Sequence, residues 1–277
     1  MSAHALPAAA GGEQPSPVLA PRPSSSIFEI PIDLAQPAEL LRTISGWASQ
    51  RRTRRVMYVN AHVVNQSRTT PGLAEALRQA DLVYCDGYGV RLAARALGLP
   101  VPHRMTGADW IWGLAALCEL SHQPVYLLGS EPPIAQEAAA RLRASYPKLE
   151  VVGAHHGYFG LNSPQNERVI EHINSHAPSL VLVGMGTPKQ ELWVDRYADQ
   201  LDGAVVWTVG ALFDYVSGHI PRAPRWLADN GLEWIFRLAI EPTRMWRRYL
   251  IGNPIFLSRV VSEARRDASE HAEHPSR

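Results

Sequence analysis

Residues 82–98, LVYCDGYGVRLAARALG, predict the fold of this chain. The first four are apolar, with Val and Tyr among them, as is typical of a buried strand. An acid and two glycines follow, and a helical pattern begins near Gly89. A strand, a short glycine turn and a helix in this order form the repeating unit of a parallel α/β sheet.

Six short apolar runs of this kind alternate with longer helical patterns. Nearly continuous apolar strands separated by helices predict a Rossmann-like, mostly parallel sheet flanked by helices on both faces. The runs are RVMYVN (55–60), DLVYC (81–85), VYLLG (125–129), LEVVGA (149–154), SLVLVG (179–184) and AVVWTVG (204–210).

Changes in composition predict four segments. Residues 1–26 are rich in Pro, Ala, Ser and Gly and are expected to be disordered. Residues 27–217 carry the strand and helix patterns and form the α/β core. Residues 218–266, rich in Trp and Arg, form a helical appendage that binds a membrane surface, and residues 267–277 form a second disordered tail.

The overall composition excludes several classes of protein. The formal net charge of the 277 residues is +1, which argues against holding nucleic acid through overall charge. The two cysteines are far apart and have no CxxC spacing, so neither a disulfide framework nor a zinc site is expected. We find no signal-peptide pattern and no apolar run long enough to span a bilayer. The expected location is therefore the cytoplasm, with peripheral membrane contact.

Small, polar and acidic residues follow the predicted strands, at the edge where such sheets bind ligands. In VGMGTPKQELW (183–193) the glycines either form a tight turn or present backbone N–H groups to a diphosphate. The P-loop and dinucleotide patterns are both absent, which argues against an NAD-dependent oxidoreductase. The candidate binding residues are Asn60, Asp86, Gly87, Gly129, Ser130, Gly184, Gly186, Thr187, Lys189, Gln190, Phe213 and Asp214.

Asp86 has two interpretations that local sequence leaves open. It is either a general base that takes the proton of an attacking alcohol, or a cap of the helix that begins near Gly89. His155 and His156 are adjacent on an extended segment and are expected to point to opposite faces, so they should not share a metal ion. No Asp-x-Asp pair occurs, and the sequence predicts neither a metal nor a cofactor.

The appendage interleaves arginines with aromatic residues. On a helix that begins at Pro242, Arg244 and Arg248 share one face. Such a helix either lies at a membrane interface, with its arginines on lipid phosphates, or packs on the domain with a solvated basic face. A non-catalytic module that binds nucleic acid or membrane through this segment is the alternative to an enzyme.

Taken together, these blocks resemble the WecG/TagA/CpsF family, glycosyltransferase family 26. The resemblance covers residues 27–257 and rests on VNAHVVNQS, ADLVYCDGYGVRLAARALGLPVPHRMTGADW, VYLLGS, VGMGTPKQELW, VGALFDYVSG and RAPRWLADNGLEWIFRLAIEPTRMWRRYL. It implies an inverting transferase that moves a sugar from a UDP-sugar to a sugar on undecaprenyl diphosphate. It also implies a peripheral enzyme on the cytoplasmic face of a bacterial inner membrane, in exopolysaccharide or surface-polysaccharide synthesis.

The resemblance also assigns roles to residues. It places the catalytic acid at Asp86, a catalytic contact to donor or acceptor at Gln190, and a pocket residue at Asn60. Tyr58 stands where members often carry Thr. The donor stays open between UDP-glucose, as in xanthan-type synthesis, and UDP-N-acetylmannosamine or its uronic acid. No nucleic-acid partner is implied, and homo-oligomers are compatible with the family. The expected ligands of the acceptor diphosphate are Arg237, Arg244, Arg247 and Arg248.

Overall fold

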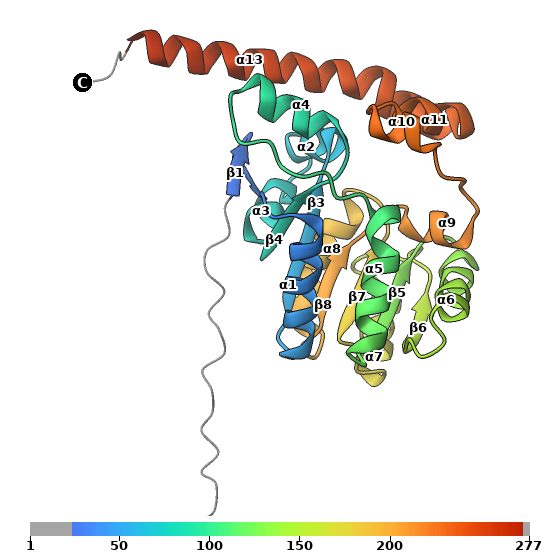
Figure 1. Cartoon of the computed structure of the whole chain (residues 1–277). Coiled ribbons are helices and arrows are strands. Elements are labelled where there is room, and N and C mark those ends of the chain that lie inside the picture. The colour runs from blue at the N-terminus through green and yellow to red at the C-terminus, as the bar shows by residue number, and fades with distance from the viewer. Residues whose placement is uncertain (1–23, 274–277) are drawn as a thin grey trace, which may run out of the picture.

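The computed structural model describes residues 24–273. Six parallel strands form the central sheet, in the order β4-β3-β8-β7-β5-β6 (Figure 1). The prediction of a Rossmann-like parallel sheet is confirmed, and each strand lies within two residues of its apolar run. The strands are β3 (Arg54–Val59), β4 (Leu82–Cys85), β5 (Val125–Gly129), β6 (Val151–His155), β7 (Leu180–Gly184) and β8 (Val205–Thr208).

Helices cover both faces of this sheet. Strand order and right-handed crossovers place α5 and α6 on one face, and α3, α7 and α8 on the other. On the first face Trp110 of α5 stacks on Trp207 of β8, with ring centroids 4.0 Å apart. The helices of the core are α1 (Pro37–Ser49), α2 (Ala61–Ser67), α3 (Leu73–Gln79), α4 (Gly89–Ala96), α5 (Gly107–Leu120), α6 (Ile134–Ser145), α7 (Pro164–Ser175), α8 (Lys189–Tyr197), the short 3-10 helix η1 (Ala198–Gln200) and α9 (Leu212–Ser217).

The sheet has a topological switch point between β5 and β7. These two strands are neighbours, but the chain leaves β5 toward α6 and leaves β7 toward α8, on the opposite face. A crevice opens where adjacent connections diverge in this way, and α/β proteins bind ligands there. The loops that follow Gly129 and Gly184 meet at this point.

An antiparallel hairpin precedes the sheet, and the sequence prediction missed it. It consists of β1 (Ser24–Ile27) and β2 (Ile30–Asp33), so residues 24–26 are a strand and not part of a disordered tail. Residues 1–23 of the predicted tail lie outside the described residues. At its tip Phe28 and Glu29 have φ +52° and +64°, as a two-residue type I′ turn requires.

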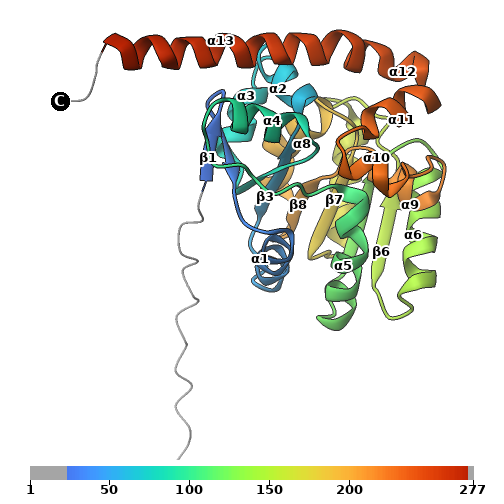
Figure 2. The ribbon, with the colours of Figure 1, turned by 45° about the horizontal axis from the view of Figure 1, so that its top comes forward.

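Helices follow Gly218 and lie over the carboxyl edge of the sheet, with α13 along the top in Figures 1 and 2. The separation of a core from an appendage stays a prediction. Pro242 begins a new helix, as expected. The helical backbone runs to Glu273, so the predicted disorder of 267–277 is wrong as far as Glu273, because this segment is rich in helix-forming Ala, Glu and Arg. The elements are α10 (Arg225–Asp229), α11 (Glu233–Ile240), α12 (Pro242–Trp246), the π-helical turn η2 (Arg247–Ile251) and α13 (Gly252–Glu273).

Candidate active site

Asp86 and Asn60 lie side by side at the carboxyl edge of the sheet, as the sequence predicts. They follow β4 and β3, which are paired in register, and the Asp86 N–H donates to the carbonyl of Val59 at 2.8 Å. The Asn60 side chain donates from Nδ2 to Asp86 Oδ2 at 3.3 Å. Its Oδ1 accepts from the N–H of Val63 and caps α2, which fixes the direction of the amide.

Asp86 does not cap the helix that follows it. The residue before α4 is Tyr88, and no side chain caps this helix. Gly87, with φ +87°, carries the chain away from the strand end, and no atom lies within 4 Å of where its Cβ would be. Asp86 therefore keeps part of its surface open above the sheet.

The surroundings of Asp86 combine burial with positive charge. Burial raises the pKa of its carboxyl above the ordinary value, while Asn60, Arg248, Thr106 and Arg104 oppose this rise. A carboxylate with a raised pKa is a stronger base than an exposed one. The positive charge of Arg248 also acts on His62. Burial and this charge together lower the pKa of His62 to about 4.

Gln190 lies beneath the surface and bonds only to protein groups among the described residues. It is fully buried; its Nε2 donates to the Tyr58 hydroxyl at 3.2 Å and to Glu191 Oε1 at 2.7 Å. Its Oε1 accepts from the N–H of Gly210 at 3.0 Å. Gln190 therefore joins the ends of β3, β7 and β8, and the substrate contact that the resemblance implies for it stays a prediction.

Glu191 is a buried carboxyl next to Gln190; the sequence places it in the polar set at this helix start, but it is not among the predicted site residues. Its Oε1 accepts from the Thr187 hydroxyl at 3.0 Å, and its Oε2 is buried without a partner among the described residues. Burial raises its pKa to about 7, against the hydrogen bonds from Gln190 and Thr187. Thr187 thus turns its hydroxyl inward, away from the predicted ligand.

This carboxyl makes stability fall as the pH rises. The ordinary pKa of this group is 4.5, and the folded protein raises it to about 7. At a pH between these two values Glu191 is ionised in the unfolded chain and neutral in the folded chain. Unfolding is favoured progressively over this window, and the loss levels off above pH 7. We expect Glu191→Gln to flatten this decline and to be more stable than the wild type at pH 8 by roughly 3 kcal/mol. Urea unfolding from pH 5 to 8 measures this, and the exposed Glu171→Gln should follow the wild type.

The switch-point loops bring Gly129, Ser130, Gly184 and Asp214 together. The Ser130 N–H donates to the carbonyl of Gly184 at 2.9 Å, and its hydroxyl donates to Asp214 Oδ2 at 3.0 Å. Ser130 has φ +52°, in the left-handed region that non-glycine residues seldom adopt. The next loop turns at Gly186, which has φ +77° and open space where a Cβ would be.

Two further residues that the sequence predicts to bind substrate make contacts within the protein. The Lys189 ammonium donates to the carbonyls of Gly157 at 2.7 Å and Phe159 at 2.5 Å, and burial lowers its pKa. Phe213 is buried, with its ring against Gly184. Both residues support these loops through contacts within the protein, and the substrate contacts expected of them stay predictions.

The four predicted arginines do not form one cluster. Arg237 is 7% exposed and bonds to the Tyr215 hydroxyl and, at 2.6 Å, to Glu241. Arg244 pairs with the same Glu241 at 3.0 Å, and Arg247 lies 5.2 Å from the Trp246 ring centroid. Arg248 is the one whose charge acts on Asp86.

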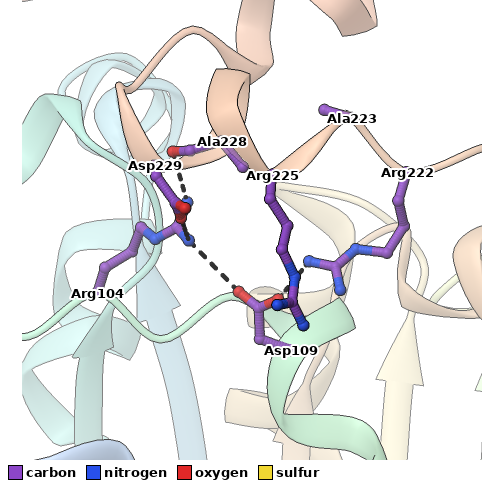
Figure 3. A pocket seen from close by; sticks show the side chains of 7 residues that line it. All are labelled: Arg104, Asp109, Arg222, Ala223, Arg225, Ala228 and Asp229. Carbon is purple, nitrogen blue, oxygen red and sulfur yellow. Dashed lines mark hydrogen bonds and ion pairs between the residues drawn. The ribbon is translucent and has the colours of Figure 1, made fainter.

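A cavity of about 470 Å³ lies between α5 and α10 (Figure 3). The Arg104 side chain enters this cavity from a loop that is tied to the end of β4, because the Met105 N–H donates to the carbonyl of Cys85. The Arg104 guanidinium donates to the carbonyl of Ala228 at 3.1 Å. Arg222 pairs with Asp109 on the same wall. The sequence reasoning missed Arg104 as a site residue, although its block PHRMTGADW combines an arginine with an acid at a helix start. The lining residues are Arg104, Asp109, Arg222, Ala223, Arg225, Ala228 and Asp229.

The adjacent histidines differ from expectation. The rings of His155 and His156 lie 4.4 Å apart, because β6 ends at His155 and the alternation of faces stops there. Among the described residues, no three His, Cys, Asp or Glu side chains are grouped so as to hold a metal ion.

Comparison with known proteins defines the class of this molecule as a glycosyltransferase. The chain belongs to the glycosyl transferase WecG/TagA/CpsF family, whose model matches residues 25–270. Similar relatives are the proteins named N-acetylglucosaminyldiphosphoundecaprenol N-acetyl-beta-D-mannosaminyltransferase of Staphylococcus aureus strains NCTC 8325 / PS 47 and COL. Each is 29% identical over 242 residues, which cover 87% of this chain and 93% of the relative. The protein of strain MW2 is 28% identical over the same length.

Proposed function

We propose that this enzyme transfers N-acetylmannosamine from UDP to N-acetylglucosamine carried on undecaprenyl diphosphate. The names of the relatives support this donor and acceptor. Of the three donor sugars that the sequence left open, glucose and the uronic acid of N-acetylmannosamine have no counterpart in these names. The observation that carries the mechanism is Asp86, which is partly open above the sheet beside Asn60.

In the proposed reaction Asp86 takes the proton of the acceptor hydroxyl. The oxygen then attacks the anomeric carbon, the bond from this carbon to the UDP oxygen breaks, and the configuration inverts. Asn60 holds the carboxylate from one side through its 3.3 Å hydrogen bond. The turns at Ser130 and Gly186 are our candidates to bind the leaving diphosphate, because they follow β5 and β7 at the switch point of the sheet.

We further propose that the outer side of α12, η2 and α13 rests on the membrane that carries the acceptor. None of the helices described in residues 24–273 is long and apolar enough to cross a bilayer. Large apolar side chains are nevertheless exposed along these elements, and the exposed Arg244 and Arg247 flank them. This combination suits an interface of apolar chains and lipid phosphates. The exposed apolar residues are Trp246, Leu250, Ile251, Ile255, Leu257 and Val261.

Transfer from labelled donors tests the proposed reaction. The enzyme is mixed with vesicles that contain N-acetylglucosaminyl-diphospho-undecaprenol and with UDP-N-acetylmannosamine, UDP-glucose or UDP-N-acetylglucosamine. We expect label to enter the lipid from UDP-N-acetylmannosamine, with one UDP released for each sugar transferred. Transfer from UDP-glucose alone would replace the donor, and no transfer from any donor would overturn the proposal.

A further inference from the structure

Asn65 anchors the start of the last helix. It lies in α2, within the block VNAHVVNQS, and the proposed reaction assigns it no role. Its Nδ2 donates to the carbonyl of Gly252 at 2.7 Å. Arg259 donates from one guanidinium nitrogen to Asn65 Oδ1 at 2.8 Å and to its backbone carbonyl at 3.3 Å. One amide thus holds α13 at two positions, two turns apart.

Apolar contacts fix the same part of α13 from the other side. Phe256 is 2% exposed, and its ring lies 6.1 Å from that of Phe28, edge to face. A Cβ on Gly89 would lie 3.7 Å from the Phe256 ring and 3.2 Å from Ala61. The start of α13 is therefore seated on the first residues of α2 and α4, which are the two helices that follow Asn60 and Asp86.

This seat determines where Arg248 lies. Arg248 belongs to η2, one helical turn before Gly252, so an anchor on Gly252 fixes it closely. Its Nε is buried and has no hydrogen-bond partner among the described residues. Its charge acts on three groups at the ends of two neighbouring strands: Tyr58 and His62 at β3, and Asp86 after β4. An arginine whose buried Nε is unpaired among the described residues, and whose charge acts on the proposed base, is placed to meet an anionic substrate group.

We propose that Asn65 is a positioning residue: by tying Gly252 and Arg259 to α2, it holds Arg248 beside Asp86, where both meet the acceptor. The proposal rests on the proposed function, because it concerns the same acceptor site. Asn65 itself contacts neither substrate. Its effect passes through the seat of α13, and loss of the seat moves Arg248 away while the core stays intact.

Asn65→Asp tests the proposal, because it replaces only the side-chain NH2 group by an oxygen. The carboxylate still accepts from Arg259 but turns an oxygen, in place of an N–H, toward the carbonyl of Gly252. Asn174→Asp is the matched control, since Asn174 donates to the carbonyl of Gln200 at 2.8 Å and accepts from the N–H of Asp202 at 3.2 Å, far from α13. Hydrogen exchange of residues 247–266 measures the seat, and exchange of the sheet strands checks that the core is folded.

The pH profile of kcat/KM measures the charge at Asp86. Arg248 lowers the pKa of this carboxyl, so its withdrawal raises the pKa and moves the acid limb to higher pH. The other charged and titratable groups around Asp86 in the described part of the chain are Arg104, Glu233, Cys85 and the tyrosines Tyr58 and Tyr84. Arg104 keeps its tie to the core through the neighbouring Met105, whose N–H donates to the carbonyl of Cys85, and α11 keeps its own through the bond from Arg237 to Tyr215 of α9, so they stay in place.

We expect Asn65→Asp to speed exchange in 247–266, to lower kcat/KM about ten- to a hundredfold, and to move the acid limb upward. Asn174→Asp should do none of these. Unchanged exchange in Asn65→Asp would overturn the proposal, and so would faster exchange with an unchanged rate and pH profile. If the wild type transfers sugar from no donor, the proposed function fails, and the exchange result alone decides whether Asn65 seats the helix.

Discussion

Asp86→Asn lowers kcat for sugar transfer by about a thousandfold. A general base contributes roughly 10²- to 10⁴-fold, and the amide cannot take the proton of the acceptor hydroxyl. The amide has nearly the shape of the carboxyl and removes a group whose pKa burial raises, so the fold should be as stable as the wild type or more so. Initial rates with UDP-N-acetylmannosamine and the lipid acceptor measure the loss.

Asp199→Asn is the control for this change. Asp199 pairs with Arg55 at 2.6 Å and is 72% exposed, so its loss alters one surface ion pair. The control should transfer sugar at the wild-type rate. Asp86→Asn with a rate within a few-fold of the wild type would mean that the acceptor hydroxyl loses its proton to another group.

Gly129→Ala destabilises the fold by about 3 kcal/mol, through overlap and backbone strain together. A Cβ at this position would lie 2.3 Å from the carbonyl oxygen of Gly184 and 2.4 Å from its carbon, both backbone atoms of the neighbouring strand. Gly129 also has φ +153°, a backbone conformation that residues with a side chain rarely adopt. The two strand ends have to separate at the switch point, so transfer should be lost as well. Urea unfolding measures the change in stability.

Gly46→Ala is the control, because it adds the same methyl group at a site where the described structure leaves room for it. Gly46 lies on the exposed side of α1, and a Cβ added there would meet no atom within 4 Å. Alanine in a helix interior is favoured over glycine by roughly 0.5–1 kcal/mol, so this variant should be slightly more stable than the wild type. If Gly129→Ala unfolds at the same urea concentration as the wild type, the strand ends at the switch point are not closely packed.

The sheet was predictable because each strand carries its own signal. An apolar run followed by Gly, Asn or Asp appears at most of the six strands, and the carboxyl edge then places Asn60 beside Asp86 without further information. The hairpin carries no such signal: SSSI and IPID are short, and serine and proline interrupt their apolar residues. Its order comes from packing, since the N–H of Val83 in β4 donates to Asp33.

The roles of Gln190 and Lys189 were not predictable from their polar surroundings. Gln190 bonds to Tyr58, 132 positions away, and Lys189 to carbonyls about 30 positions away. A polar residue at a helix start looks the same in sequence whether it meets a ligand or another loop. Arg104 was missed for the complementary reason, because its partners Asp229 and Glu233 come from distant helices.

The contact between Phe28 and Phe256 joins the first described hairpin to the last helix. During synthesis the hairpin and the whole sheet leave the ribosome before residue 256 does, and the core can fold while its seat for α13 is still empty. Arg248 comes to Asp86 only after that seat is filled. A nascent chain thus has its proposed base long before it has a finished acceptor site, and we expect activity only after α13 has been made and has packed on the core.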